Sequence, residues 1–178
     1  GQAAVVIQEA TAVSPEGRIS YGDLGIWKDE HIPKLKEITT FIKEQECIPG
    51  LQLAHAGRKA STDKPWLSRH QIAPTELNGW QTYSSSTLPF QEGEVPPKTL
   101  TFEEIQKVVD DFKQAARRAV EAGYEIIEIH AAHGYLLHQF FSPLINNRTD
   151  EYGGSFENRI RLLLQIIDCF PFGENFLN

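Results

Sequence analysis

Two histidines and a tyrosine, His130, His133 and Tyr135, lie within six consecutive residues of this 178-residue chain. Apolar and polar side chains alternate over 125–130, which predicts a strand that ends at His130. Two imidazoles at a strand end can donate hydrogen bonds to a substrate oxygen and stabilise negative charge that develops on it. A phenol beside them can donate a proton to carbon. The segment therefore predicts an oxygen-binding and proton-donating site.

Zinc binding is the alternative use for two neighbouring histidines. The helical zinc motif is His-Glu-x-x-His, and both the spacing and the strand setting differ at His130 and His133. No third ligand is evident in the sequence. We therefore expect no metal. For either histidine alone a structural role would be the default, whereas the whole cluster at a strand end favours function.

Gln52 is a second candidate, because it lies in the short apolar strand predicted at 51–54. A buried amide must find hydrogen-bond partners. It donates and accepts together, which suits the pyrimidine edge of a flavin. An amide satisfied by neighbouring backbone is equally compatible with this pattern.

Two other polar stretches are expected to be structural. His55, Arg58 and Lys59 follow the 51–54 strand and could meet an anionic ligand, but a solvated edge of a long loop is favoured. Residues 146–155 are dense in turn-forming residues before a helix capped by Ser155. Asx turns that pin this loop are favoured over direct catalysis.

Short strands alternate with helices along the chain. Strands are predicted at 4–7, 51–54 and 125–130, and helices at 31–46, from a capping box at Thr101 to a stop at Gly123, and after Ser155. The continuous apolar run at 4–7 is typical of a strand covered on both faces. Between 57 and 100 the pattern is lost, and so long a loop is functional or holds small elements of its own.

The helical period also predicts which side chains are buried. The expected apolar faces are Ile32, Leu35, Ile38, Phe41 and Ile42 in the first helix, Ile105, Val108, Val109, Phe112, Ala116 and Ala119 in the second, and Ile160, Leu163, Leu164 and Ile167 in the third.

This order of elements calls for a parallel sheet with crossover helices. A doubly wound dinucleotide fold should show Gly-x-Gly-x-x-Gly directly after its first strand, and none follows residue 7. A barrel places its chemistry at the carboxyl ends of its strands, where the polar side chains occur: Glu9, Gln52, His55, His130 and His133. The predicted fold class is α/β, an incomplete TIM (β/α)8 barrel with about three βα units.

Composition narrows the class of protein. The net charge is −7 and the 17 basic residues are scattered, so no nucleic-acid partner is expected. No segment is apolar enough for a membrane span, and two distant cysteines make no disulfide framework, which favours a reducing, cytoplasmic compartment. The sequence contains no methionine and opens directly into an apolar run, as expected for a sequence that begins inside a longer protein.

Three motifs in order resemble the old yellow enzymes, closest to the branch of bacterial and fungal NADPH dehydrogenases and xenobiotic reductases. They are Gln-Leu-Ala-His-Ala-Gly-Arg at 52–58, Glu-Ile-His-Ala-Ala-His-Gly-Tyr-Leu at 128–136, and Arg-x-Asp-x-Tyr-Gly-Gly-Ser-x-Glu-Asn-Arg at 148–159. The resemblance runs from about Val5 to Asp168. It implies a TIM barrel that binds FMN at its mouth. It also implies NAD(P)H as reductant and hydride transfer from the flavin N5 to an α,β-unsaturated carbonyl or nitro compound.

The resemblance assigns roles to particular residues. His130 and His133 would hold the carbonyl or nitro oxygen of a small-molecule substrate, and Tyr135 would protonate its α-carbon. Gln52 would hydrogen-bond the flavin ring, and Ala10 would touch the flavin through its backbone. The resemblance leaves assembly of full-length members into a homo-oligomer open.

The chain also departs from the family pattern. We expect residues 1–168 to be a partial FMN-dependent barrel and 169–178 to be a tail unlike the family. The family's first strand would precede Val5, while its flavin-side arginine and phosphate-binding strands would follow Asp168. Without a phosphate site, weak or absent FMN binding is expected, and exposed strand edges favour aggregation. The alternative function is a catalytically inactive fragment with at most a binding role.

Overall fold

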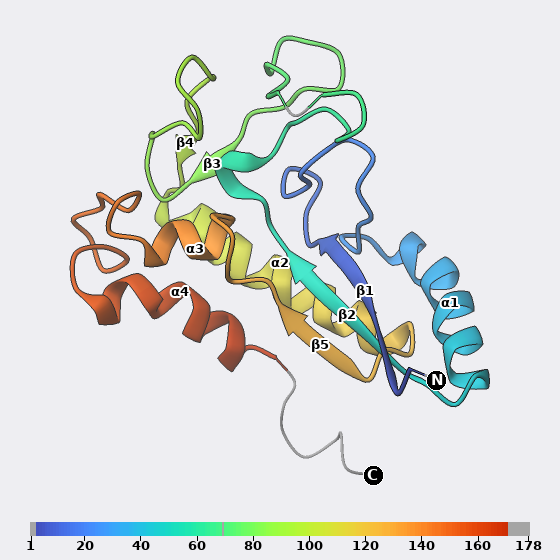
Figure 1. Ribbon diagram of the computed structural model, residues 1–178. Coiled ribbons are helices and arrows are strands. Elements are labelled where there is room, and N and C mark those ends of the chain that lie inside the picture. The colour runs from blue at the N-terminus through green and yellow to red at the C-terminus, as the bar shows by residue number, and fades with distance from the viewer. Residues whose placement is uncertain (1–2, 69, 171–178) are drawn as a thin grey trace.

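A parallel sheet forms the centre of the computed structural model, which describes residues 3–68 and 70–170. Its strands are β1 (Val5–Ala12), β2 (Ile48–Ala54) and β5 (Ile126–Ile129), paired in the order β1-β2-β5 (Figure 1). Each new strand is added on the same side of the one before it, as in a βα barrel. All the predicted strands are confirmed, and β1 and β2 begin or end several residues outside the predicted spans.

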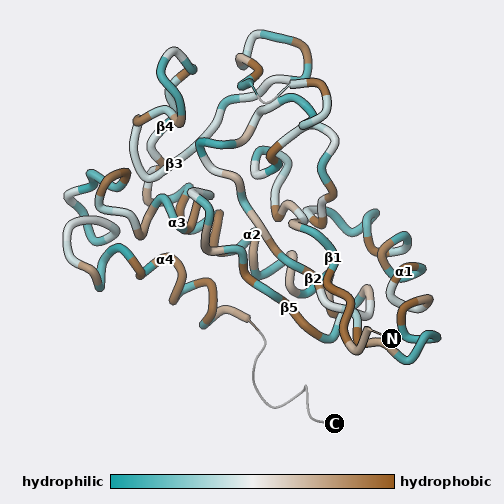
Figure 2. Tube along the Cα trace, in the orientation of Figure 1, coloured by the Kyte–Doolittle hydropathy of each residue, from teal (hydrophilic) through white to brown (hydrophobic). Residues whose placement is uncertain are grey.

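Helices cover one face of this sheet. They are α1 (Ile32–Glu44), α2 (Phe102–Glu121), the short α3 (Leu136–Phe141) and α4 (Phe156–Asp168), with a 3-10 turn η1 (Asp29–His31) before α1. Figure 1 shows α2 running behind the strands. Leu51 and Leu53 of β2 point to that side and are fully buried, and they join Phe112 of α2 in one hydrophobic core. In Figure 2 the hydrophobic stretches gather on the strands, and the loops beyond their carboxyl ends are mostly polar.

The ends of α2 are fixed as the sequence predicts. The Thr101 hydroxyl accepts a hydrogen bond from the Glu104 N–H at 3.2 Å, and the Glu104 carboxylate accepts one from the Thr101 N–H at 2.8 Å. This reciprocal cap satisfies two N–H groups that the helix itself leaves unpaired. Gly123 ends the helix with φ +93°, a left-handed conformation that side chains disfavour. The capping box, the stop and most of the predicted buried face of α2 are confirmed.

The predicted buried faces of the other two helices are partly wrong. In α1 the buried side chains include Ile32 and Leu35, whereas Ile38 and Phe41 are 46% and 63% exposed. In α4 Leu162 and Ile166 are buried, whereas the predicted Leu164 and Ile167 are 47% and 40% exposed. The helical period fixes that a stripe exists, but neighbouring elements decide which flank of it is covered. For α4 those neighbours are α2 and α3.

The expectation that the first strand is covered on both faces is wrong. Val5, Val6 and Ile7 are between 38% and 47% exposed. In the described part of the chain β2 is the one strand that pairs with β1, whose other edge has a single bridge from Ala12 to Gly25, and no layer covers the sheet face opposite the helices. Ile48 of β2 is in register with Val5 and is 41% exposed, because the same sheet face is uncovered there.

The long irregular stretch holds small elements of its own, as predicted. A 3-10 turn η2 (Gly57–Lys59) follows β2, and β3 (Tyr83–Ser84) pairs in parallel with β4 (Lys98–Thr99). The helix α3 was not predicted, because six residues are too short to show a helical period. The loop before α4 is pinned as expected: Asn146 and Asp150 accept hydrogen bonds from backbone N–H groups two residues on, and Ser155 caps α4.

No helix of the described residues is both long and apolar enough to cross a membrane. The predicted tail boundary at residue 169 stays a prediction, since residues 171–178 lie outside the described part of the chain.

Candidate active site

The three predicted catalytic residues lie together beyond the end of β5. The His130 N–H donates to the Leu53 carbonyl at 2.9 Å, which continues the pairing of β5 with β2 by one residue. Nε2 of His130 lies 3.3 Å from Nδ1 of His133. The His130 ring lies edge-on to the rings of His133 and Tyr135, with centroids 5.1 Å and 4.8 Å apart. The cluster that the sequence indicates is therefore a single group of contacting rings.

A tight turn brings Tyr135 back over His130. His133 and Gly134 both have left-handed backbones, with φ of +56° and +75°. The first is unusual for a residue with a side chain, and such backbones concentrate at functional sites. Tyr135 then occupies the residue position directly before α3, without a capping hydrogen bond from its side chain. The turn places an exposed imidazole, a buried imidazole and a phenol within six consecutive residues.

The contacts of His130 define its hydrogen-bonding form. Its Nδ1 accepts from the Ala132 N–H at 3.3 Å, so in the neutral ring Nε2 carries the proton. Burial lowers the pKa of His130, and the neighbouring His133 lowers it further. The ring is thus a neutral donor at neutral pH. The one N–H of this ring is therefore on Nε2, the nitrogen that lies 3.3 Å from Nδ1 of His133.

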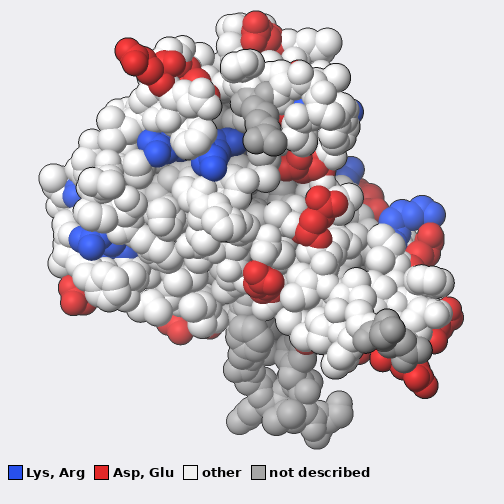
Figure 3. Space-filling model, viewed as in Figure 1, with Lys and Arg blue, Asp and Glu red and all other residues white. Residues whose placement is uncertain are grey.

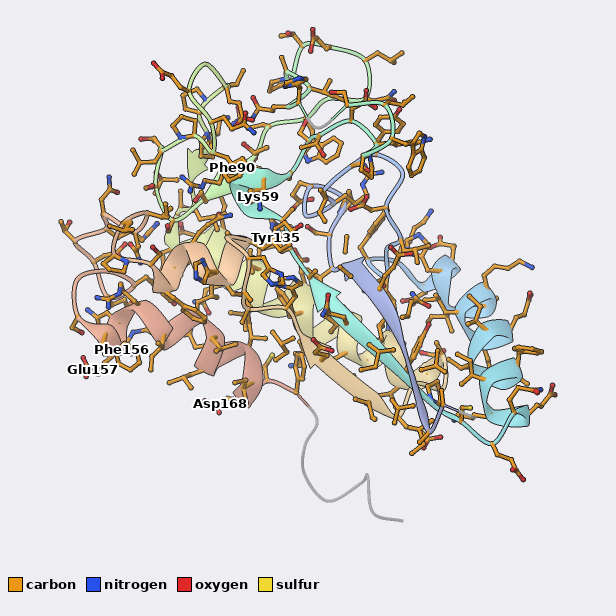
Figure 4. The ribbon with its side chains drawn as sticks, viewed as in Figure 1. Lys59, Phe90, Tyr135, Phe156, Glu157 and Asp168 are labelled. Carbon is orange, nitrogen blue, oxygen red and sulfur yellow. The ribbon has the colours of Figure 1, made fainter. Side chains whose placement is uncertain are left out.

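Tyr135 forms part of the wall of a cavity of about 770 Å³ at the carboxyl ends of β1 and β2. Ala10 of β1 lies on the same cavity, as do Lys59 and Phe90. Figure 4 shows Phe90, Lys59 and Tyr135, which all line this cavity, one after another. Burial raises the pKa of the Tyr135 phenol, and the charge of Asp23 adds to the effect. The phenol keeps its proton at neutral pH, as a proton donor must.

Gln52 lies on the same sheet face as His130 but is less enclosed than the sequence indicates. It is half-buried, and its Nε2 donates to Oε1 of Glu128 on β5 at 2.7 Å. Gln52 and Glu128 are register partners, and His130 is two residues beyond Glu128, so side-chain alternation places all three on one face. The partner of the amide is thus a carboxylate on the neighbouring strand. Among the described residues that line the cavity, Ala10 is present and Gln52 is not.

The expectation of a solvated edge for His55, Arg58 and Lys59 is wrong. His55 is 3% exposed, its Nδ1 accepts from the Gly57 N–H at 3.0 Å, and burial lowers its pKa to about 4. Arg58 donates to the carbonyls of Leu88 and Pro89 at 3.2 Å and 2.9 Å. The turn lies beneath the 83–90 segment, so its polar groups bond to protein and build one wall of the cavity.

Gln139 of α3 positions this site, and the sequence gives little sign of it. The side chain is fully buried. Its Nε2 donates to the carbonyls of Gly134 and Ala56 at 2.7 Å and 3.2 Å, and its Oε1 accepts from the Arg58 N–H at 3.2 Å. One amide therefore ties the loop after β5 to the loop after β2. The one available signal is a polar residue at a position flanked by Leu136, Leu137 and Phe140.

Replacing Gln139 by leucine is expected to lower the free energy of unfolding by about 2–4 kcal/mol, because three buried backbone groups lose their partner. Gln114→Leu is the control, since the amide of Gln114 contacts only the Arg117 side chain by hydrogen bond among the described residues. Urea unfolding followed by circular dichroism measures both. Equal stability of the two variants would contradict the role given to Gln139.

Surface charge is mixed rather than one-sided. Figure 3 shows acidic groups spread over this face of the molecule and basic groups gathered in small separate places. The cavity rim has both signs, with Asp23 and Glu94 on one hand and Arg58 and Lys59 on the other. The pattern fits a site for a small polar molecule with an apolar part.

A βα-barrel sector with hydrogen-bond donors at its strand ends defines a class of small-molecule enzyme, and comparison with known proteins narrows it. The sequence model of the NADH:flavin oxidoreductase / NADH oxidase family matches residues 1–170, and the chain belongs to this family of FMN-dependent oxidoreductases.

Individual relatives agree with that assignment. An NADH:flavin oxidoreductase from Gibberella zeae is 55% identical over 163 residues, covering 90% of this chain and 40% of that protein. An NADPH dehydrogenase from Bacillus subtilis is 51% identical over 168 residues, which cover 94% of this chain and 45% of that protein. The chain therefore spans less than half the length of these curated relatives.

Solved structures share the fold. An old yellow enzyme from a Pichia species superposes with a TM-score of 0.80 at 33% identity, over 93% of this chain and 42% of that one. Morphinone reductase in complex with tetrahydroNAD superposes with a TM-score of 0.77 at 31% identity, over 93% of this chain and 47% of that one. These neighbours confirm the predicted barrel class and the resemblance to old yellow enzymes, with this chain as a part of the barrel.

Proposed function

We propose that this chain carries the substrate-binding and proton-donating residues of an FMN-dependent NAD(P)H oxidoreductase of the ene-reductase type. Its substrates would be α,β-unsaturated carbonyl or nitro compounds. The observation that supports this most is the contacting group of His130, His133 and Tyr135, of which Tyr135 lines a cavity that Ala10 lines as well. The family and the names of the relatives supply the cofactor and the reductant.

The residues present fit a flavin. A cavity of about 770 Å³ is within the range of small-molecule sites, roughly 300–1,000 Å³. Ala10 offers backbone at its wall, and Gln52 offers an amide that can donate and accept on the same sheet face as His130. These two would hold FMN. The chemistry that FMN would supply here, when bound and reduced by NAD(P)H, is a hydride for the substrate β-carbon.

The chain's own residues account for the rest of the reaction. The imidazoles of His130 and His133 bind the carbonyl or nitro oxygen and stabilise the negative charge that grows there when the C=C bond accepts a hydride. The phenol of Tyr135 then delivers its proton to the α-carbon. The alkene gains one hydride and one proton in total, and Tyr135 recovers its proton from solvent.

The test is addition of FMN to the purified protein, followed by desalting and a visible spectrum. Retained flavin absorbance, with NADPH-dependent consumption of 2-cyclohexenone, is the result that the proposal requires. Protein that stays colourless after FMN is added would contradict the function for this chain.

A second candidate is a chain that binds small molecules or another chain without turnover. The exposed Val5, Ile7 and Ile48 on the uncovered sheet face favour it, because such a surface gains stability when another layer packs on it. Colourless protein that binds a phenolic ligand, or sediments as a larger species, would support this candidate.

A further inference from the structure

Lys59 lies in the wall of the cavity. Among the basic residues of that wall in the described chain, it is the one that contacts both Tyr135 and Phe90. It belongs to η2, the turn after β2. Its Nζ donates to the carbonyl of His133 at 3.0 Å. The same Nζ lies 4.9 Å from the centroid of the Tyr135 ring and 4.7 Å from that of Phe90. One ammonium group thus contacts the imidazole turn, the phenol and the opposite wall.

The opposite wall is held at one end by Gln71, whose side chain bonds both backbone groups of Val95 at 3.1 Å and 2.8 Å. It consists of residues 87–95, here called the Phe90 segment, an irregular stretch whose Leu88 and Phe90 are 41% and 44% exposed. The neighbouring Arg58 donates to the carbonyls of Leu88 and Pro89 and lies 5.8 Å from the Phe90 ring. Arg58 therefore holds the segment to η2, and Lys59 alone of the two reaches across to Tyr135.

The chemistry of an ammonium group suits this place. Its attraction to an aromatic face strengthens where water is excluded, and Lys59 is half-buried. Its stem passes beside Gly134, where a β-carbon would lie 3.6 Å from Lys59 Cδ. With one N–H given to a carbonyl, the cation fixes the ring of Tyr135 from one side and that of Phe90 from the other.

We propose that Lys59 is a positioning residue, whose ammonium group clamps the Phe90 segment to the Tyr135 ring and so holds the phenol where it protonates substrate. The catalytic part of this inference rests on the proposed function. The clamp itself is a property of the chain and can be measured without flavin or turnover.

Chymotrypsin cleavage after Phe90, identified by mass spectrometry in the cofactor-free protein, measures how often the segment opens. Lys59→Met keeps the stem and removes the charge, and it is expected to raise the cleavage rate about 3- to 10-fold. Lys59→Arg should restore the slow rate, because a guanidinium group also binds aromatic faces.

Lys64→Met is the matched control. Lys64 contacts the rings of Tyr21 and Trp66 through the same kind of interaction but does not contact Phe90 or Tyr135 in the described structure. Equal cleavage after Phe90 in Lys59→Met and Lys64→Met would overturn the clamp, as would failure of Lys59→Arg to restore protection.

A spectroscopic measurement separates positioning of Tyr135 from general loosening. Difference titration at the tyrosinate band, against a Tyr135→Phe reference in each background, gives the pKa of this phenol. A guanidinium group at position 59 keeps its charge while the phenol titrates, and a nearby cation favours the phenolate, so the phenol pKa should be lower in Lys59→Arg than in Lys59→Met. Equal phenol pKa values in Lys59→Arg and Lys59→Met would overturn the contact with Tyr135. Neither assay needs FMN, so a failed flavin test leaves both outcomes readable.

Discussion

Replacing His130 and His133 together by alanine is expected to weaken binding of phenolic or enone ligands by at least about 100-fold, because an oxygen held by two preorganised donors would lose both. The two rings form one unit, in which the buried His130 contacts and orients the exposed His133. The single variants should therefore lose nearly as much as the double variant. Ligand titration monitored by the charge-transfer band or by calorimetry measures the affinities.

The control for this prediction is His138→Ala. His138 is an exposed histidine of α3, close in sequence but not part of the ring cluster in the described structure. The His138→Ala variant should bind the ligand with the same affinity as the unaltered protein. Retained affinity in the double variant would refute the oxygen-binding role of the pair.

Under the proposed function, replacing Tyr135 by phenylalanine in the flavin-loaded protein is expected to slow alkene reduction by about 10²- to 10⁴-fold, the usual contribution of a positioned proton donor. The ring contacts with His130 and Lys59 do not require the hydroxyl, so the site should keep its shape. Reduction of the flavin by NADPH transfers no proton to carbon and should keep its rate. Stopped-flow measurement of the two half-reactions separates these effects.

Tyr83→Phe removes a phenol of β3 that does not line the cavity in the described structure, and both half-reactions should be unaffected. If Tyr135→Phe slowed both half-reactions equally, the loss would come from disturbed flavin binding, and the proton-donor role would be wrong.

The sequence predicted those features that depend only on residues close together in the chain. The capping box at Thr101, the stop at Gly123 and the cap at Ser155 need only neighbours in sequence, and all are observed. The grouping of His130, His133 and Tyr135 was equally accessible, because a strand end followed by a tight turn leaves few places for three side chains. The roles of these residues, and of Ala10 and Gln52, remain proposals.

Contacts between distant segments account for what the sequence did not predict. The burial of His55 depends on Gly17, whose missing side chain leaves room for the imidazole: a β-carbon there would lie 2.9 Å from the ring. The role proposed for Lys59 depends on its contact with Phe90, which lies 31 residues later. The stretch between them has no periodic pattern from which this contact could be predicted. The exposed flanks of α1 and α4 likewise depend on which neighbours pack against them. None of these contacts has a period or a motif that a single sequence can show.

The amide of Gln139 has a consequence for how this site can diversify. It joins the first residues after β2 to the turn after β5, and the irregular stretch that ends at β4 lies between these two points in the sequence. Insertions or deletions between Thr62 and Thr82 would reshape the rim while the amide kept the imidazole turn in register with the sheet. Substrate range could change through the rim alone, with the reacting groups held in a fixed frame.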